Sequence, residues 1–415
     1  VNLLRHVMGE ESFWKAIHHY VEKYSWQNVD TGELIDAISE STGQNLQWFF
    51  DEWVYKMGHP IFDVTSTYDQ AAGAVKLNVK QSQKKDDKSP WYQSPDLFTS
   101  PVDVAITTAS GEHIQRIWVD KPEQEFTIKV DSKPLIVNFD RGDYVIKELN
   151  FSKPDDELAY QAEHDSDVMG RIWALSQLKT KKGTLAEEAI EREATHDTFW
   201  GARLEAIRDM IGMTDDSAKS TLLSALKDKD SRVRGEAVQH LGSLKDKSLA
   251  PTFTELIKSD PSYLVVSRAA IGLGQTGSSD GYPVLMSLMN ENSWQDNLRG
   301  AAMRGLAALK DPRVLDMALK YAAPGHTEGL RGASFLALAQ VGKGNDQATN
   351  LLIGALKEPS EQVVFAAVQA LGELGDARAI PAIEELETRP DLPGFVKPFL
   401  DNVINGIKNK QKDKS

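Results

Sequence analysis

The first 58 residues carry apolar side chains at the spacing of amphipathic helices. Leu3, Leu4, Val7 and Met8 recur at intervals of one, three and four residues, as the apolar face of a helix does. The same spacing continues to about Tyr24, so the chain is predicted to open in helices.

Capping residues predict two further helices in this segment. Thr31 is a plausible N-cap for a helix over Leu34–Ser41, and Gly43 a plausible end for it. Asn45 then opens a short aromatic helix, and Gly58-His59-Pro60 ends it.

From Ile61 to about Asn150 the apolar period changes to two, which is typical of strands that bury one face. The apolar positions of the predicted strands are Phe62 and Val64; Val75, Leu77 and Val79; Val102, Val104 and Ile106; Ile114, Ile117 and Trp118; Phe126, Ile128 and Val130; and Ile136, Val137 and Phe139. Turn residues separate these runs, so we expect a small antiparallel β-sandwich. The polar stretch Lys84–Ser94 is predicted to be a long hairpin loop.

The rest of the chain repeats itself. Leu241, Leu273, Leu306, Leu338 and Leu371 lie 32, 33, 32 and 33 residues apart, each after a run of small and apolar residues. A period near 32 with two amphipathic helices per unit indicates an α-solenoid, and the run Asp230–Leu241 resembles short HEAT-like repeats.

These patterns predict a multidomain α+β protein: a short helical segment, an antiparallel β-sandwich and an α-α superhelix. The expected domains are 1–60, closing helices of a larger lobe; 61–152, the sandwich; 160–405, the helical repeats; and 406–415, a solvated basic tail.

Composition narrows the function classes. The chain has no cysteine, which excludes disulfides, thiolate metal sites and a cysteine nucleophile. Its net charge of −14 disfavours nucleic acid as a partner, and no apolar run reaches the length of a membrane span. The compartment stays open between cytoplasm and periplasm. Because Val1 already stands inside a helical pattern, we expect a fragment of a longer chain.

No metal site is predicted within the chain. A helix-borne zinc pair needs two histidines four residues apart, with a glutamate after the first. None of the nine histidines meets this spacing, and the adjacent His18 and His19 should point to different faces of their helix.

Two motif matches also favour structural interpretations. Gly272–Gly277 fits the dinucleotide pattern G-x-G-x-x-G, but its glycines align with glycines of the other repeats, so close packing and helix ends are the preferred reading. Ser279, in a G-x-S-x-G match, should lie in a loop between helices with no strand before it, so a nucleophilic role is disfavoured.

Recurrent charged and aromatic residues are likewise read as structural. The column Arg234, Arg268, Arg299 and Arg331 is expected to pair with acidic loop residues such as Asp230 or Asp260 rather than with phosphates. Trp14, Trp26, Trp48 and Trp53 are expected to pack in a core. Taken alone, the residues supply no catalytic, cofactor-binding or metal site.

The first 60 residues resemble a known family. The runs Arg5–Trp14, Tyr20–Tyr24 and Asn45–Trp53, followed by Gly58-His59-Pro60, are similar to the closing helices of the catalytic lobe in aminopeptidase N-type zinc metallopeptidases. The following sandwich, ending in Val137–Gly142, is similar to that family's third domain, and a helical-repeat domain comes last there too.

The resemblance implies that the parent chain is a zinc aminopeptidase acting on peptides, in which zinc-bound water attacks the first peptide bond. The family's H-E-x-x-H zinc helix and catalytic tyrosine precede the segment that Val1 matches, so no catalytic residue can be transferred here. We therefore expect this chain alone to be inactive and without a cofactor, with its repeats capping the catalytic cleft.

Two alternatives remain open. The chain could belong to a scaffold whose metallopeptidase-like part has lost zinc, as in a transcription-initiation factor of this architecture, or to a HEAT-like adaptor with a protein partner on the solenoid. If the chain is such a fragment, residues 1–58 should pack onto the sandwich and leave part of their apolar surface exposed where the missing lobe would dock. Ala237, Ala302 and Ala367 should mark points where helices approach closely, so that Ala302→Trp would overpack the repeats.

Overall fold

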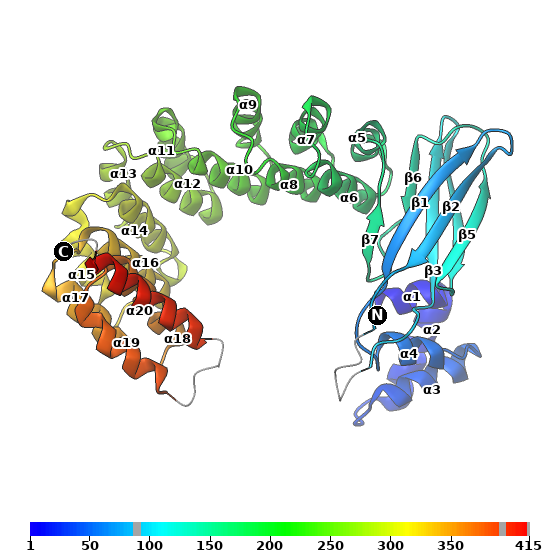
Figure 1. The fold of residues 1–415 in the computed structure, drawn as a ribbon, viewed down its shortest axis with the longest axis horizontal. Helices are drawn as coiled ribbons and strands as arrows, with labels where there is room; N and C mark the ends of the chain where they lie inside the picture. The colour runs from blue at the N-terminus through cyan, green and yellow to red at the C-terminus, as the bar shows by residue number, and fades with distance from the viewer. Residues whose placement is uncertain (86–92, 390–395, 413–415) are drawn as a thin grey trace. The chain divides into compact units, whose positions relative to one another are not determined.

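The computed structural model describes residues 1–85, 93–389 and 396–412 of the 415-residue chain. Contacts divide the chain into two compact units, Val1–Asp209 and Met210–Ser415. Figure 1 labels their helices and strands. The observed class is the predicted one: a helical start, two small sheets and a long run of helical repeats. The predicted domain bounds at 60, 152 and 160 stay predictions.

The chain opens in the helices α1 (Asn2–Met8), α2 (Glu10–Tyr24), α3 (Thr31–Thr42) and α4 (Gln47–Trp53). Asp30, one residue before the predicted cap, starts α3: its side chain accepts from the Gly32 amide, and Glu33 closes a capping box. Gly43 ends the helix in the left-handed region, as expected.

The strands that follow in the described part of the chain are β1 (Ile61–Asp69), β2 (Ala74–Gln81), β3 (Ser100–Thr108), β4 (Gly111–Val119), β5 (Glu123–Lys129), β6 (Ile136–Phe139) and β7 (Glu148–Phe151). They form a four-stranded sheet in the order β5-β2-β1-β7 and a three-stranded sheet in the order β4-β3-β6. The rings of Phe62 and Phe139 meet between the sheets at 5.5 Å. The predicted sandwich is thereby confirmed.

Two details of the sandwich differ from the prediction. Strand β7, which has only Leu149 and Phe151 as apolar residues, escaped the pattern, and it pairs with β1 in parallel rather than antiparallel. The predicted hairpin loop 84–94 falls largely outside the described residues. The strands it joins, β2 and β3, belong to different sheets, so the connection is a crossover between sheets and not a hairpin.

The first repeat helices belong to the first unit: α5 (Asp155–His164), α6 (Val168–Leu178), α7 (Thr184–His196) and α8 (Trp200–Asp209). The second unit continues with α9 (Asp216–Ala225), α10 (Ser231–Ser243), α11 (Ala250–Ser259), α12 (Tyr263–Gln275), α13 (Gly281–Leu288), α14 (Asn297–Leu309), α15 (Leu315–Ala322), α16 (Glu328–Val341), α17 (Asp346–Ala355), α18 (Glu361–Leu374), α19 (Ile380–Glu387) and α20 (Val396–Lys412). Short 3-10 turns precede α11, α14, α15 and α19.

Within the second unit the helices form two rows. Helices α10, α12, α14, α16 and α18 pack closely in succession, whereas α11 and α13, or α15 and α17, hardly touch. Glycines permit the close row: a Cβ on Gly274 would lie 2.0 Å from the carbonyl oxygen of Gly305. Because one row is tightly spaced and the other splays, the unit curves with the close row on its inner side (Figure 1).

The predicted tail is part of a helix as far as Lys412, although Lys408, Lys410 and Lys412 are exposed as the prediction of a solvated segment requires. Lys408–Lys412 continue α20, because Leu400, Ile404 and Ile407 repeat at helical spacing and are buried against the last repeat. The Lys410 ammonium also donates to the carbonyl oxygens of Gly372 and Glu373, each at 3.0 Å. Favourable burial and these hydrogen bonds outweigh the charge of the lysines.

Candidate functional site

The opening helices pack on the sandwich, as predicted. Their buried residues and those of both sheets form one hydrophobic core cluster. The Trp48 ring meets that of Trp118 on β4 at 6.1 Å. The Trp53 ring lies 4.9 Å from Phe98, and its Nε1 donates to the carbonyl oxygen of Thr99 at 3.0 Å. Segments 1–53 and 61–151 thus share one core, and the short opening segment depends on the sandwich to bury its apolar side chains.

A carboxylate fixes the same contact. Glu52 on α4 accepts a hydrogen bond from the backbone amide of Thr99 at 2.6 Å and another from its hydroxyl at 3.2 Å. Burial raises the pKa of the Glu52 carboxyl, and the two bonds from Thr99 act in the opposite direction. The role of Glu52 is therefore to fix the backbone at Thr99, directly before β3, rather than to transfer protons.

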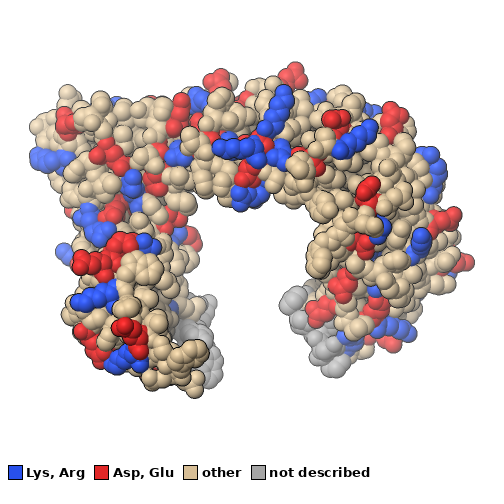
Figure 2. Space-filling view, turned by 180° about the vertical axis from the view of Figure 1, so that it is seen from behind, with Lys and Arg blue, Asp and Glu red and all other residues tan. Residues whose placement is uncertain are grey.

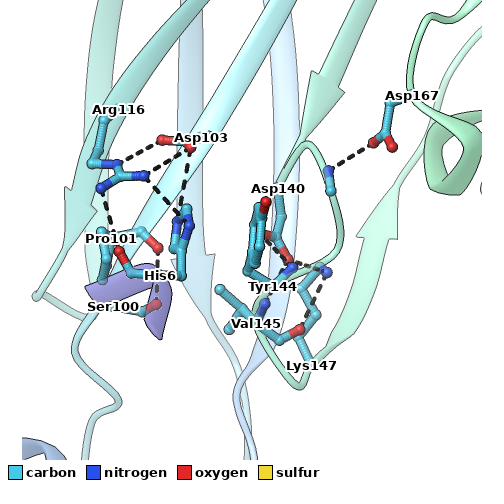
Figure 3. A network of polar contacts seen from close by, with 11 residues as sticks. His6, Ser100, Pro101, Asp103, Arg116, Asp140, Tyr144, Val145, Lys147 and Asp167 are labelled. Atoms are coloured by element: carbon cyan, nitrogen blue, oxygen red, sulfur yellow. Dashed lines mark hydrogen bonds and ion pairs between the residues drawn. The ribbon is translucent and has the colours of Figure 1, made fainter. Parts of the chain in front are cut away.

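His6 on α1 is inserted against β3 and β4 (Figure 3). Its ring stacks on that of Tyr144 at 4.1 Å, and its Nδ1 lies 3.4 Å from a nitrogen of the Arg116 guanidinium, which in turn holds Asp103 with bonds of 2.8 and 3.0 Å. Because the guanidinium can only donate, Nδ1 accepts and Nε2 carries the hydrogen. That Nε2 has no hydrogen-bond partner among the described residues.

We call the contacts of α1 and α4 with the sandwich, together with the turn after β6 and the start of α6, the joint. The turn after β6 is held in it by polar contacts. Asp140 and Asp143 both adopt positive φ, and the buried Asp140 carboxylate accepts from the Lys147 ammonium at 2.5 Å and the Val145 amide at 2.9 Å. The Gly142 amide donates to Asp167 at 2.7 Å, which ties the turn to the start of α6 (Figure 3). Burial raises the pKa of the Asp140 carboxyl, although Lys147 opposes the shift.

A cavity of 360 Å³ lies between this turn and α6. Lys153, almost fully buried, lines it and donates to the carbonyl oxygen of Val137 and to Oε1 of Gln161, both at 2.6 Å. The ammonium also faces the rings of Phe151 and Trp173 at 4.8 and 5.2 Å. Burial lowers the pKa of the Lys153 ammonium, against the nearby Glu157 charge.

The chemistry of this cavity is that of a satisfied polar network. Asp165 accepts from Asn138, Gln161 and the Asp167 amide, and Gly170 is required beside it, since a Cβ there would lie 2.2 Å from an Asp165 oxygen. In such a network the charges are held by one another and position the backbone. The joint is suited to fixing the opening helices, the sandwich and the first repeat together.

The discounted motifs have the positions expected of structural residues. Gly272 and Gly274 lie inside α12, Gly274 packs against α14, and Gly277 has positive φ just after the helix. Ser279 is exposed in the loop between α12 and α13. The dinucleotide and hydrolase readings therefore lack the strand that each requires.

The arginine column pairs within the repeats. Arg234 holds Asp260 with bonds of 2.8 and 2.9 Å, Arg268 reaches Glu236 at 2.8 Å, and Arg331 holds Glu358 through both guanidinium nitrogens. Arg299 pairs with Asp296 at 2.8 Å. On the face shown in Figure 2, acidic and basic side chains are intermingled rather than gathered by sign.

The sequence interpretation was wrong for two tryptophans. Trp48 and Trp53 pack against the core, but Trp14 is half-exposed and Trp26 fully exposed. Helix α2 ends at Tyr24, and Trp26 adopts a positive φ beyond it, so helical spacing no longer sets where that side chain points.

Several residues of the joint were missed by sequence reasoning. His6 on α1 lies 110 residues before Arg116, which faces Asp103 across the β3–β4 pair, and no local pattern joins the histidine to these two strands. A weak signal existed for the turn after β6, because an Asp-Arg-Gly-Asp run directly after a strand is rich in turn formers.

No metal centre is assembled in the parts of the chain that the structure describes: no three His, Asp or Glu side chains gather as ligands there. Among the helices of those parts, none has the length and apolar character needed to span a membrane.

The fold defines a class of protein: a multidomain α+β chain in which opening helices pack on a β-sandwich and helical repeats follow. Comparison with known families makes this specific. A model described as "Peptidase family M1 domain" matches residues 1–53, and one described as "HEAT repeats" matches 186–274, 250–339 and 327–393, together half of the chain. The chain belongs to the HEAT-repeat family and is M1 aminopeptidase-like in its opening helices.

Individual proteins of known name are similar to this chain over the same regions. A puromycin-sensitive aminopeptidase of Caenorhabditis elegans is 24% identical over 235 residues, which cover 54% of this chain and 24% of that protein. The transcription initiation factor TFIID subunit 2 of Drosophila melanogaster is 22% identical over 218 residues, covering 46% and 18%. The chain thus spans about a quarter or less of these curated relatives.

A solved structure has the same fold. The crystal structure of Legionella pneumophila aminopeptidase A in complex with aspartic acid aligns with a TM-score of 0.61 at 13% identity, covering 100% of this chain and 56% of that one.

Proposed function

We propose that this chain acts as the C-terminal region of a zinc aminopeptidase that removes N-terminal residues from peptides, with its helical repeats capping the catalytic cleft. The observation that carries the proposal is the joint between the M1-like helices and the sandwich. The two parts share one hydrophobic core cluster, Trp53 and Glu52 bond to Thr99 just before β3, and His6 contacts Arg116 on β4, so the M1-like part and the sandwich form one packed body.

Exposed apolar residues on the opening helices support the same proposal. Trp14 and Val21 on α2, and Val54 and Tyr55 just after α4, are each about half-exposed. Exposed apolar side chains that gather in a patch mark a contact region, and we propose that these residues belong to one. Its proposed partner is the remainder of an M1 catalytic lobe, since residues 1–53 match only a small part of that domain.

Zinc is the metal of the M1 family generally, but the residues of this chain do not fit it. The described histidines are scattered, and His6 is already engaged by Arg116 and Tyr144. We therefore derive no catalytic step from this chain. Its proposed contribution is to position the lobe and to restrict which peptides reach it.

Deletion tests the capping role. Residues 160–415 are removed from the whole protein, and turnover of di- and tripeptides is compared with that of long peptides. If the repeats cap the cleft, the length preference changes while short substrates are still cleaved. An unchanged length preference would exclude the capping role.

A second function is favoured by the similarity to the TFIID subunit, which extends over nearly half of the chain. In this alternative the chain is a scaffold whose M1-like part holds no zinc. The two functions differ in the whole protein: an intact H-E-x-x-H motif with bound zinc and peptidase activity supports the aminopeptidase, and loss of that motif supports the scaffold.

A further inference from the structure

One arginine in the repeats is an exception to the pairing described above. Arg304, on α14, makes neither a hydrogen bond nor an ion pair in the described residues, whereas each of the other arginines has a partner. The arginines of the column show the contrast, since Arg299 on the same helix and Arg331 on α16 each hold a carboxylate.

Arg304 does not lack a partner because water surrounds its side chain. The side chain is only partly exposed, and burial lowers the pKa of its guanidinium with no carboxylate to offset the effect. A guanidinium stays charged in proteins, so partial burial without an anion is unfavourable. An anion that bound there would regain this free energy.

Arg304 stands at the edge of a groove of 250 Å³ on the inner row of helices. Among the described residues, the groove is lined by α14, which supplies Arg304, by α16, which supplies Gly329 and Gly332, and by α18, which supplies Gln362 and Gln369. It therefore lies on the face of the inner row that points away from the outer helices.

The glycines of the groove differ from those that pack helices together. A Cβ on Gly274 would collide with a neighbouring backbone, but a Cβ on Gly329 would meet nothing within 4 Å, and one on Gly332 would meet only Ala366, at 3.8 Å. Packing within the described chain thus does not require these two glycines. Their effect is to leave room for a backbone to approach the floor of the groove.

The walls indicate what could lie there. The amides of Gln362 and Gln369 can both donate and accept, as an extended peptide backbone requires. Glu373 is held by Gln340 at 2.9 Å, and Glu328 adds a second negative charge beside the groove. Two carboxylates disfavour a polyanion such as nucleic acid or a phosphate dianion, and leave a single carboxylate next to Arg304 as the matching charge.

We propose that the groove over α14, α16 and α18 binds an extended peptide segment whose carboxylate pairs with Arg304. The carboxylate comes either from the C-terminus of the peptide or from an acidic side chain. This site is independent of the proposed aminopeptidase function, because a scaffold could use it as well.

Direct binding tests the proposal on the 415-residue chain without any activity measurement. Three fluorescent decapeptides of Gly, Ser and Ala are compared by anisotropy: one with a free C-terminal carboxylate, one amidated, and one amidated with a central Glu. Tighter binding of the first than of the second assigns the C-terminal carboxylate, and tighter binding of the third assigns a side-chain carboxylate. Equal binding of all three, or no binding, overturns the proposal.

Variants locate the site. Arg304→Gln should weaken binding of the preferred peptide by about tenfold or more, which corresponds to losing a charged hydrogen-bonded pair. Arg304→Lys should retain part of it. Gly332→Leu, which fills the groove and favours the helix, should abolish binding without lowering the melting temperature. Arg313→Gln, which removes an exposed arginine paired with Asp311, is the matched control and should bind as the wild type.

The opposite pattern is decisive as well. If Arg304→Gln and Gly332→Leu, both folded, bind the preferred peptide as tightly as the wild type, the peptide binds elsewhere and the proposal is wrong. Inorganic phosphate provides the last arm: displacement of the peptide by phosphate as readily as by acetate would mark a general anion site and contradict a peptide-carboxylate site.

Discussion

The Arg171 guanidinium holds the Asp197 carboxylate with two parallel bonds, from Nε at 2.7 Å and from a terminal nitrogen at 3.0 Å. Arg171 lies on α6 and Asp197 directly follows α7, so the pair joins one repeat to the next. The Asp197 side chain is only 1% exposed, and it also accepts from the Phe199 amide at 2.7 Å. Arg234 and Asp260 repeat this relationship in the second unit.

Removing one partner of this buried pair should be costly. Arg171→Ala leaves the Asp197 charge buried, and we expect the free energy of unfolding to fall by about 3–5 kcal/mol. Thermal and urea unfolding of the purified chain measure the change. Arg232→Ala is the control: its guanidinium is half-exposed in the ion pair with Asp230, so its loss should cost much less than the loss of Arg171. Equal effects of the two variants would refute the structural role of the buried pair.

Close packing of the inner helices gives a second prediction. Gly274→Ala places a Cβ where the Gly305 carbonyl oxygen stands, so α12 and α14 must separate, and we expect a loss of about 1–3 kcal/mol. Ala302, fully buried on α14, should respond to Ala302→Trp in the same range. Gly354→Ala is the matched control, because a Cβ there meets nothing within 4 Å and should stabilise its helix by about 0.5 kcal/mol. Differential scanning calorimetry would show all three.

The parts of this fold that could be predicted from the sequence are those set by local periods. Alternation placed β1 to β6, and the spacing of Leu241 to Leu371 placed the repeats, because each pattern reports which face of one element is buried. Glycine alignment between repeats likewise gave the packing role of Gly274.

What escaped prediction depends on contacts between distant segments. Strand β7 is defined by pairing with β1, nearly 90 residues earlier, and its own four residues carry little signal. The His6–Arg116–Asp103 contact and the Arg171–Asp197 pair need the tertiary fold, and Arg304 is distinguished only by the partner it lacks among the described residues. The lysine-rich composition of residues 408–412 suggested a tail, but these residues continue α20, whose position is set by the buried side chains of Leu400, Ile404 and Ile407.

The pH dependence of stability should reflect His6. Burial and the Arg116 charge lower the pKa of His6 below its ordinary 6.5, with Asp103 acting in the opposite direction. Below pH 6.5 the unfolded chain therefore binds a proton that the folded chain resists, so the free energy of unfolding falls as pH falls through the folded-state pKa. Above pH 6.5 this contribution is constant.

A variant isolates this contribution. His6→Gln removes the titrating ring, so its stability should fall less steeply between pH 6.5 and 5 than that of the wild type, whatever its stability at neutral pH. His113→Gln, at an exposed position on β4, should keep the wild-type slope. Urea unfolding at several pH values measures both slopes, and identical slopes for wild type and His6→Gln would contradict the assignment.

Metal binding by this chain should be weak, and its peptidase activity absent. The two best histidine–carboxylate pairs of the opening helices diverge: His18 lies 3.2 Å from Glu22, and His19 lies 2.9 Å from Glu40. The Lys23 ammonium already holds Glu40 at 2.6 Å and would repel a cation. Neither pair provides the three protein ligands of a catalytic zinc site.

After dialysis, metal analysis should therefore find far less than one zinc per chain, and aminoacyl-anilide substrates should not be turned over. An active M1 aminopeptidase treated in the same way serves as the positive control. One tightly held zinc per chain, or turnover that a chelator abolishes, would show that this chain carries catalytic machinery of its own and would overturn the view of it as a positioning and capping region.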